Sequence, residues 1–356
     1  MGRGRPKADI WVVPRLTVLA SVLVALAWAP AGASAHGHAD RRIATHGPDP
    51  RPARGVARAH AAAAQPAAPW CGDERANDVP GATDGLAGFH AVYAVAADAP
   101  SRLQQVAPTI QGDAAAASGI LEQQYGRAIR FDRGTSCGPG YLDITTLRLP
   151  QTTAALQRLA QTPNGTLDAI GRALRKAGFA TAQLGDPARA RGQRLRNFVV
   201  WLDGPYPAAS CGQAELSVDR RRSPDNVNNG GGKVAAIFAD GAGFCGPSTV
   251  LHEIGHTLGA VQPRPGESGW TGHCHDDAAD VLCDAAAPPA ATGARTVVDA
   301  AHDDYWDPPS GAPLPWWTMN LSRFLCPDVA CSTAPAAATQ ARVRTNARSR
   351  PRAARR

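Results

Sequence analysis

The sequence predicts an α/β (α+β) domain built on a mixed, twisted sheet, and three observations lead to that class. Strand-like and helix-like segments alternate between residues 90 and 202. Residues 198–202 form a continuous apolar run, as a buried central strand requires. Residues 250–258 then carry apolar side chains at helical spacing. We therefore expect a sheet with backing helices and one later helix, followed by irregular chain.

Short apolar or alternating runs bounded by turn residues predict the strands, and apolar residues three or four positions apart predict the helices. The expected strands are 90–95, 128–131, 142–147 and 198–202, and the expected helices are 114–125, 152–160 and 166–177. Segments 215–218 and 233–239 flank a turn rich in Asn and Gly. We expect these two segments to pair or to lie along the sheet edge.

The first 35 residues have the pattern of a secretory signal. Four basic residues accompany a fourteen-residue, largely apolar run at 16–29, and Ala33-Ser34-Ala35 follows as a cleavage site. That run is shorter than the roughly 20 residues of a membrane-spanning helix, and no later run reaches that length. We expect a secreted, extracellular protein that is cut after Ala35 and has no membrane span.

Composition divides the remaining chain into three parts. Residues 36–70 are rich in Ala, Pro, Arg and His, which predicts a disordered linker or a short pro-segment. Residues 332–356 predict a disordered basic tail, because Ala, Pro and Arg cannot bury enough surface to fold. The folded domain is expected at 71–331, with an N-terminal subdomain at 71–260 and an irregular, disulfide-rich C-terminal subdomain at 261–331.

The formal net charge of +7 does not describe this folded domain. Residues 71–331 contain 21 basic and 27 acidic residues, a net charge of −6. An acidic body lacks the basic footprint of a nucleic-acid-binding protein, so we expect no nucleic acid as a partner. The basic tail is either a solvated end or a contact for an anionic cell surface. We expect the chain to act as a monomer.

All eight cysteines lie between residues 71 and 331, inside the expected domain. An even number of cysteines in an exported chain predicts disulfides in an oxidising compartment. No C-x-x-C occurs, which argues against cysteine ligands for zinc. We favour the pairs Cys211–Cys245 and Cys274–Cys283, because each would close a loop beside the motif described next.

The sequence H-E-x-x-H at 252–256 is the most informative motif of the chain. On a helix, His252 and His256 lie one turn apart on the same face and can bind the same zinc ion. Glu253 then points toward the open coordination position, where a water molecule would sit. A buried helix whose two imidazoles only form hydrogen bonds is the alternative, and each ring would then need a polar partner.

The motif and the glycine at 259 resemble the metzincin clan of zinc metallopeptidases, whose motif is H-E-x-x-H-x-x-G-x-x-H. The resemblance covers roughly residues 89–325 at the level of the fold, and its specific part is 252–259. It implies a metzincin-like zincin, a secreted zinc-dependent endopeptidase (metalloendopeptidase) with Glu253 as general base and acid and a peptide or protein as substrate. In this clan the substrate lies extended along the edge strand before the active-site helix, which implies residues 233–240 here.

The third zinc ligand is where the sequence departs from the clan, because Gln262 stands in place of the third His. An amide oxygen is a weaker zinc ligand than imidazole. His273 is the preferred replacement, since it lies in the loop after the helix beside Cys274, whose disulfide would restrain it. The alternatives are Gln262, His275, Asp276 and Asp280.

A second departure concerns the methionine turn of the clan, where Leu282 occupies the methionine position. Leucine can form the same apolar floor beneath the metal. The two departures, Gln262 and Leu282, also motivate a different hypothesis, a non-catalytic extracellular binding module on a decayed zincin fold. A zinc amidase acting on cell-wall material is a further alternative, because it would share the metal chemistry.

The polar run at 302–307, His-Asp-Asp-Tyr-Trp-Asp, is a second cluster of possible ligands. It is either a structural calcium site or an exposed acidic turn. Clustered Asp without defined ligand spacing is common on protein surfaces, which favours the turn. His90 is expected to be a hydrogen-bonded strand residue.

Overall fold

The computed structural model describes residues 43–45 and 87–326 of the 356-residue chain. Gaps within the second range are at 136–137, 163, 183–194, 205–210, 240–243, 266, 268–269, 278 and 284–294. The expected signal at 1–35, most of the segment 36–70 and the basic tail at 332–356 lie outside the described residues. The boundaries drawn from composition therefore remain predictions.

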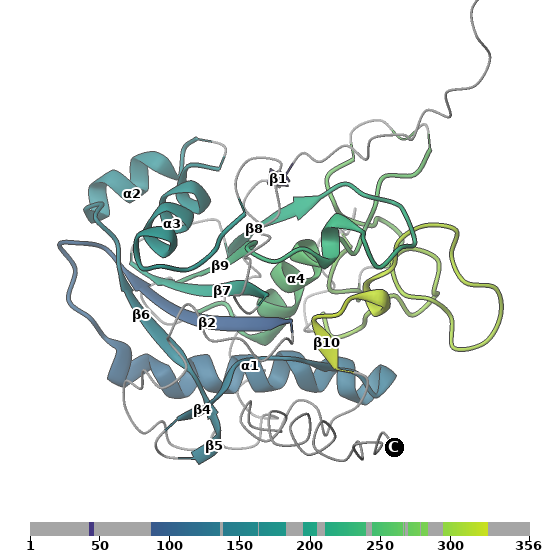
Figure 1. Ribbon diagram of the computed structural model, residues 1–356, viewed down its shortest axis with the longest axis horizontal. Helices are drawn as coiled ribbons and strands as arrows, with labels where there is room; N and C mark the ends of the chain where they lie inside the picture. Colours follow the sequence, from purple (N-terminus) through teal and green to yellow (C-terminus); the bar gives the residue numbers. More distant parts are fainter. Residues whose placement is uncertain are drawn as a thin grey trace, which may run out of the picture. The chain divides into compact units, whose positions relative to one another are not determined.

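A mixed five-stranded sheet is the centre of the molecule (Figure 1). Its strands are β2 (Gly88–Val95), β6 (Ile144–Arg148), β7 (Arg196–Asp203), β8 (Gly212–Ser217) and β9 (Val234–Phe238), in the order β8-β9-β7-β2-β6. Four strands are parallel, and β8 is antiparallel to β9. The short strand β1 (Ile43–Thr45) extends the sheet beyond β8.

Helices cover both faces of the sheet, which confirms the α/β class (Figure 1). One face packs against α1 (Leu103–Tyr125) and α4 (Pro247–Thr257), and the other packs against α2 (Thr153–Leu159) and α3 (Gly165–Lys176). Successive strand residues alternate between the two cores: Val199 and Trp201 join the first, whereas Val200 joins the second. All four helices thus bury one side against apolar strands.

The described residues after α4 contain little regular structure, as expected for 261–331. They include the 3₁₀ turn η3 (Met319–Leu321) and β10 (Leu325–Cys326), which pairs with β3 (Ala128–Ile129). A second small sheet joins β4 (Arg133–Thr135) to β5 (Gly138–Leu142), and the 3₁₀ turn η2 (Val227–Asn229) lies between β8 and β9. The pairing of β10 with β3 joins the end of this region to the chain that follows α1.

Three sequence-based expectations need correction. The helix expected at 114–125 begins eleven residues earlier, at Leu103, because burial of Leu103, Ala107 and Ile110 outweighs the helix-breaking tendency of Pro108. The segment 233–240 is not the sheet edge: β9 lies between β7 and β8, and β1 pairs with the outer side of β8. Residues 43–45 of the expected disordered segment form β1.

Both expected disulfides are confirmed, Cys211–Cys245 and Cys274–Cys283. Each closes a loop that lies next to α4 in the chain or in space. Within 43–45 and the described parts of 87–326, no helix is long and apolar enough to cross a membrane.

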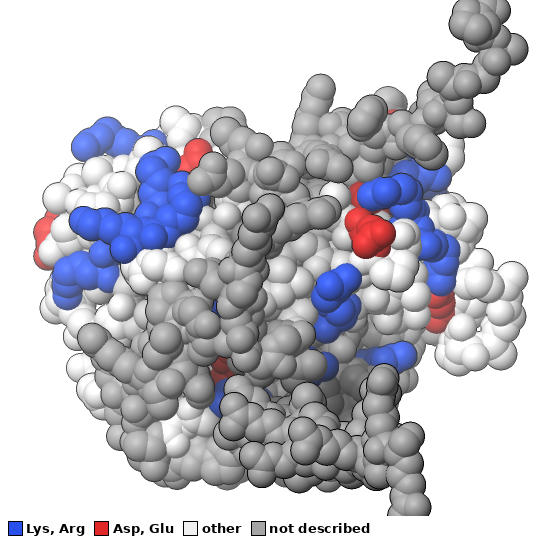
Figure 2. Space-filling model, in the orientation of Figure 1, with Lys and Arg blue, Asp and Glu red and all other residues white. Residues whose placement is uncertain are grey.

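Charged side chains are unevenly spread over the surface. In Figure 2, Lys and Arg side chains gather at the upper left, over α2 and α3. Arg158, Arg172, Arg175 and Lys176 are the exposed basic residues of these helices. They lie on the opposite face of the sheet from α4.

Because the apolar side chains of α4 are buried, truncating one of them should lower the free energy of unfolding substantially. Ile254 is fully buried in the core between α4 and the sheet, whereas Leu321 is 37% exposed. Ile254→Ala should lower the free energy of unfolding by about 3 kcal/mol, because it leaves a cavity. Leu321→Ala should change it by less than about 0.5 kcal/mol. Equal effects in denaturant titrations with disulfides intact would show that α4 is not packed as described.

Candidate metal centre

Helix α4 carries the H-E-x-x-H motif in the arrangement that the sequence predicts. Pro247 occupies the first turn, and the helix ends at Thr257. Gly259 then adopts a φ of 67°, which lets the chain leave the helix sharply. Val250, Leu251 and other apolar side chains of α4 are buried, and this packing fixes the side of the helix that presents His252 and His256.

A buried lysine holds the C-terminal end of α4. The Lys233 ammonium donates to the Thr257 carbonyl at 2.7 Å and to Asn228 Oδ1 at 3.3 Å. A cation at this end interacts favourably with the helix dipole. Burial lowers the pKa of Lys233 to about 7. The end of the helix that carries His256 is therefore anchored to the start of β9.

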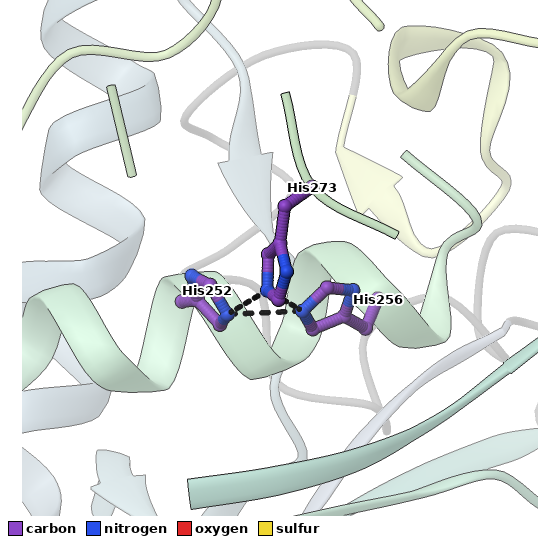
Figure 3. Close-up of side chains that lie close together, drawn as sticks. All are labelled: His252, His256 and His273. Atoms are coloured by element: carbon purple, nitrogen blue, oxygen red, sulfur yellow. Dashed lines mark hydrogen bonds between the residues drawn. The ribbon is translucent and has the colours of Figure 1, made fainter. Parts of the chain in front are cut away.

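The loop after α4 brings His273 to the two helical imidazoles (Figure 3). The Nε2 atoms of His252 and His256 are 2.9 Å apart, and His273 Nε2 lies 3.2 Å from each of them. All three rings are buried, with exposures of 8% or less. The three residues thus form a compact group that can hold a metal ion.

The spacing of these nitrogens fits a tetrahedral zinc site. Zinc–nitrogen bonds of 2.0–2.1 Å in tetrahedral geometry place ligand nitrogens about 3.3 Å apart. The observed separations are within about 0.4 Å of that value. Three Nε2 atoms cannot all pair with one another, because each neutral ring offers there either one hydrogen or one lone pair. A shared cation would satisfy all three at once.

His252 is held in the tautomer that a metal ligand requires. Its Nδ1 lies 2.5 Å from the Val281 carbonyl, which can only accept a hydrogen bond. Nδ1 therefore carries the hydrogen, and the lone pair of the neutral ring is on Nε2, which faces the other two histidines. Val281 thus sets the orientation of a candidate ligand through its backbone.

Asp280 organises the loop that presents this carbonyl. Its carboxylate accepts hydrogen bonds from the Tyr305 hydroxyl at 2.7 and 2.8 Å and from the backbone N–H of Leu282 at 2.6 Å and of Asp299 at 2.5 Å. Burial raises the pKa of Asp280 to about 6 despite these donors. Asp280 was a candidate ligand in the sequence, but it is not part of the three-histidine group; it precedes Val281, whose carbonyl contacts His252.

Leu282 packs beneath the helix that bears the motif. A Cβ at Gly255 would lie 2.8 Å from Leu282 Cδ1, so the leucine occupies the space beside this glycine. Leu282 is 1% exposed. The residue at the expected methionine position therefore forms an apolar floor under α4.

Glu253 lies against the edge strand of the sheet. Its side chain is fully buried, and a Cβ at Gly212 on β8 would lie 2.1 Å from Glu253 Oε1. Only glycine at 212 leaves room for this carboxylate. No feature of the sequence indicated that Gly212 approaches Glu253, since the two residues are 41 positions apart.

The other candidate ligands have different surroundings. The Gln262 side chain accepts from Asp219 N and donates to the carbonyls of Ser217 and Gly259, so its amide ties the loop after α4 to the end of β8. His275 and Asp276 are exposed. Asp276 lies near Cys274, Cys283 and Asp304, but those two cysteines form a disulfide and offer no thiolate.

The acidic run at 302–307 is more buried than a surface turn. Tyr305 and Trp306 are 0% and 4% exposed, and the Trp306 ring stacks on Tyr125 at 4.2 Å. The Asp299 carboxylate accepts from four backbone N–H groups, those of residues 303–306, and Asp304 pairs with Arg264. These contacts account for the cluster of Asp299, Asp303 and Asp304 without a cation. Calcium there remains only a prediction.

His90 is a hydrogen-bonded core residue, as expected. Its Nδ1 lies 2.9 Å from Asp132 Oδ2 and its Nε2 lies 2.6 Å from Thr145 Oγ1. Arg196 donates to the same Asp132 oxygen. This polar cluster is fully internal and lies among strand residues, away from the three-histidine group.

No protein family and no curated protein matches the sequence. Among solved structures, one similar chain is described as catalytic inactive OgpA from Akkermansia muciniphila in complex with an O-glycopeptide (glycodrosocin) substrate. The match has 10% identity and a TM-score of 0.29 and spans 49% of either chain. A similarity this small supports no conclusion about fold or function.

Zinc analysis of matched alanine variants tests the three-histidine group. The parent should hold about one zinc ion per chain after dialysis, as a preorganised three-ligand site does. His273→Ala should lose it, whereas His275→Ala should retain it, because His275 is exposed two residues away. Loss of zinc from Gln262→Ala alone would instead assign the third ligand to Gln262.

Asp280→Asn tests the supporting role of the loop. The Asp280 carboxylate accepts hydrogen bonds on both oxygens, whereas one end of an Asn side chain is an N–H donor that cannot accept. The loop should therefore shift, and His252 should lose its fixed orientation. Zinc affinity should fall roughly 10- to 100-fold in competition with a chelator. Tyr305→Phe, which removes a single donor, should have a smaller effect. Unchanged affinity in Asp280→Asn would separate this loop from the metal site.

Proposed function

We propose that the chain is a secreted zinc-dependent endopeptidase with a metzincin-like zincin fold, whose ligands are His252, His256 and His273. The observation that carries the proposal is the convergence of three buried Nε2 atoms, with Glu253 on the same helix. Three protein ligands are typical of catalytic zinc sites, which keep a position open. Structural zinc sites use four.

A zinc ion in this position would supply a Lewis acid that polarises the scissile carbonyl and makes a water molecule more acidic. Glu253 follows His252 directly on α4, and its carboxylate lies against Gly212 of β8. It would accept the proton of the attacking water and return it to the leaving amine. The buried surroundings strengthen each of these electrostatic interactions.

β8 is the strand with which a peptide substrate would pair, and in the structure β1 pairs with its residues 215–217. An extended peptide can add as a strand to an exposed sheet edge and gain backbone hydrogen bonds there. β8 borders the site, because Gly212 packs against Glu253. A peptide paired with β8 would pass the general base, which supports an extended polypeptide as substrate.

Export is part of the proposal. The signal pattern at 1–35 and the two disulfides favour an oxidising, extracytoplasmic location. A zinc amidase for cell-wall material would use the same metal and the same Glu253. A peptide library and a wall fragment, assayed in parallel, separate the two substrates.

Glu253→Gln is the direct test of the catalytic role. The variant keeps the shape of the side chain and all three histidines, so it should hold zinc like the parent. It cannot accept a proton, so kcat/KM should fall by a factor of roughly 10² to 10⁴. Full turnover with zinc bound would remove Glu253 from the mechanism.

The same pair of proteins addresses the binding-module hypothesis. A folded parent that holds no zinc and cleaves nothing would favour a decayed site. A parent that holds zinc and cleaves a peptide, with a zinc-loaded and inactive Glu253→Gln variant, would exclude it. Zinc content is therefore measured on every sample whose turnover is measured.

A further inference from the structure

The two ends of α4 are held to the rest of the domain in different ways. At the C-terminal end, three consecutive carbonyl groups accept hydrogen bonds from buried side chains. The pairs are Lys233 Nζ with Thr257, Trp317 Nε1 with Leu258 and Gln262 Nε2 with Gly259, at 2.7, 2.9 and 3.0 Å. Carbonyl groups at a helix end lack partners within the helix, so these bonds stabilise the turn that carries His256.

The N-terminal end of α4 is attached covalently. Its N-cap residue, Gly246, has no side chain that could accept from the first backbone N–H groups of the helix. The residue before it, Cys245, forms the disulfide with Cys211. The Cys211 carbonyl accepts from the backbone N–H of Phe238 at 2.8 Å, which fixes this cysteine to the end of β9. The disulfide therefore joins the start of α4 to the sheet against which the helix packs (Figure 1).

This disulfide lies one residue away from the contact that Glu253 makes with β8. Cys211 directly precedes Gly212 in the chain. A Cβ at Gly212 would lie 2.1 Å from Oε1, 2.7 Å from Cδ and 2.8 Å from Cγ of Glu253. Gly212 is also paired with Ile237 of β9. The end of the Glu253 side chain therefore rests on a piece of backbone that both the sheet and the disulfide hold in place.

We propose that Gly212 and the Cys211–Cys245 disulfide are positioning elements for Glu253, whereas zinc binding depends on the other end of α4 and on the loop at 273–283. This inference rests on the proposed function, which gives Glu253 the role of general base. A general base must lie within hydrogen-bonding reach of the proton that it accepts. A displacement of about 1 Å can lower the rate roughly 100-fold. Holding the base is thus separate from holding the metal.

Gly212→Ala, made in the full exported chain, tests the contact directly. The added methyl group needs the space of the Glu253 carboxylate, and the end of a side chain moves more easily than the backbone of a paired strand. We expect kcat to fall about 100-fold, with KM and zinc content unchanged. Gly204→Ala is the matched control, because a Cβ at Gly204 would meet no described atom within 4 Å. Equal kcat in the two variants would overturn the role of Gly212.

A shorter base provides a rescue that a purely structural role of Gly212 does not predict. Glu253→Asp withdraws the carboxylate by one methylene group, which leaves room for a methyl group at position 212. Glu253→Asp should lower kcat in the parent, but in the Gly212→Ala background its effect should be smaller by about tenfold or more. Additive effects of the two substitutions would show that these positions act independently, and would overturn the inference.

Removal of the disulfide gives a readout that does not require turnover. In the double variant Cys211→Ala, Cys245→Ala, hydrogen exchange should become faster at the amides of residues 250–253, whose hydrogen bonds reach the first turn of α4. Exchange at 255–258 should match the parent, because the C-terminal anchors remain. Zinc affinity, measured against a chelator, should be unchanged, and kcat should fall roughly tenfold. Faster exchange along the whole helix would overturn the division between its ends.

The other described disulfide supplies the matched comparison, because removing either one also loosens the unfolded chain and lowers stability. Cys274 follows His273 directly. The double variant Cys274→Ala, Cys283→Ala should therefore lose zinc affinity, in contrast to the first pair. All proteins are compared well below their unfolding temperatures. An equal loss of zinc affinity in both double variants would indicate general destabilisation and would overturn the inference.

The outcomes keep this inference distinct from the proposed function. If Glu253→Gln abolishes cleavage but Gly212→Ala and the Cys211, Cys245 variant match the parent, positioning is overturned while the enzyme stands. If no sample cleaves peptides, the endopeptidase proposal fails. Exchange that rises only at 250–253 would then still support the separate attachment of the N-terminal end of α4, and exchange that is unchanged there would overturn it.

Discussion

Three imidazole nitrogens that meet in a buried space are the constraint on which the rest of this structure depends. His252, His256 and His273 bring their Nε2 atoms within 3.2 Å of one another. Neutral rings cannot all satisfy each other in such a triangle, and protonated rings would repel. A shared cation would satisfy all three nitrogens at once, and the loop after α4 brings the third one to the helix.

The surrounding structure keeps this arrangement in place. The Cys274–Cys283 disulfide restrains the residue next to His273, and Asp280 fixes the backbone whose Val281 carbonyl orients His252. Lys233 anchors the end of α4, and Leu282 fills the space beneath it. Four kinds of interaction thus converge on one short helix and one loop. Such support is what a catalytic site needs to hold its ligands within a fraction of an ångström.

Sequence patterns were sufficient for features that depend on local chemistry. Apolar spacing predicted α4 and the strand β7, and loop closure predicted both described disulfides. The features that the sequence did not predict depend on contacts between distant parts of the chain. Burial extended α1 past Pro108, and the insertion of β9 inside the sheet depends on strand order, which local patterns do not specify. The contact of Gly212 with Glu253 joins distant residues and leaves no local signal.

X-ray absorption at the zinc edge of the purified protein tests the central claim most directly. Coordination by His252, His256 and His273 predicts three imidazole nitrogens at about 2.0–2.1 Å and one further light atom, without sulfur. The imidazole signature should weaken in His273→Ala. A spectrum dominated by sulfur at about 2.3 Å, or one with two imidazoles that is unaffected by that substitution, would contradict the account.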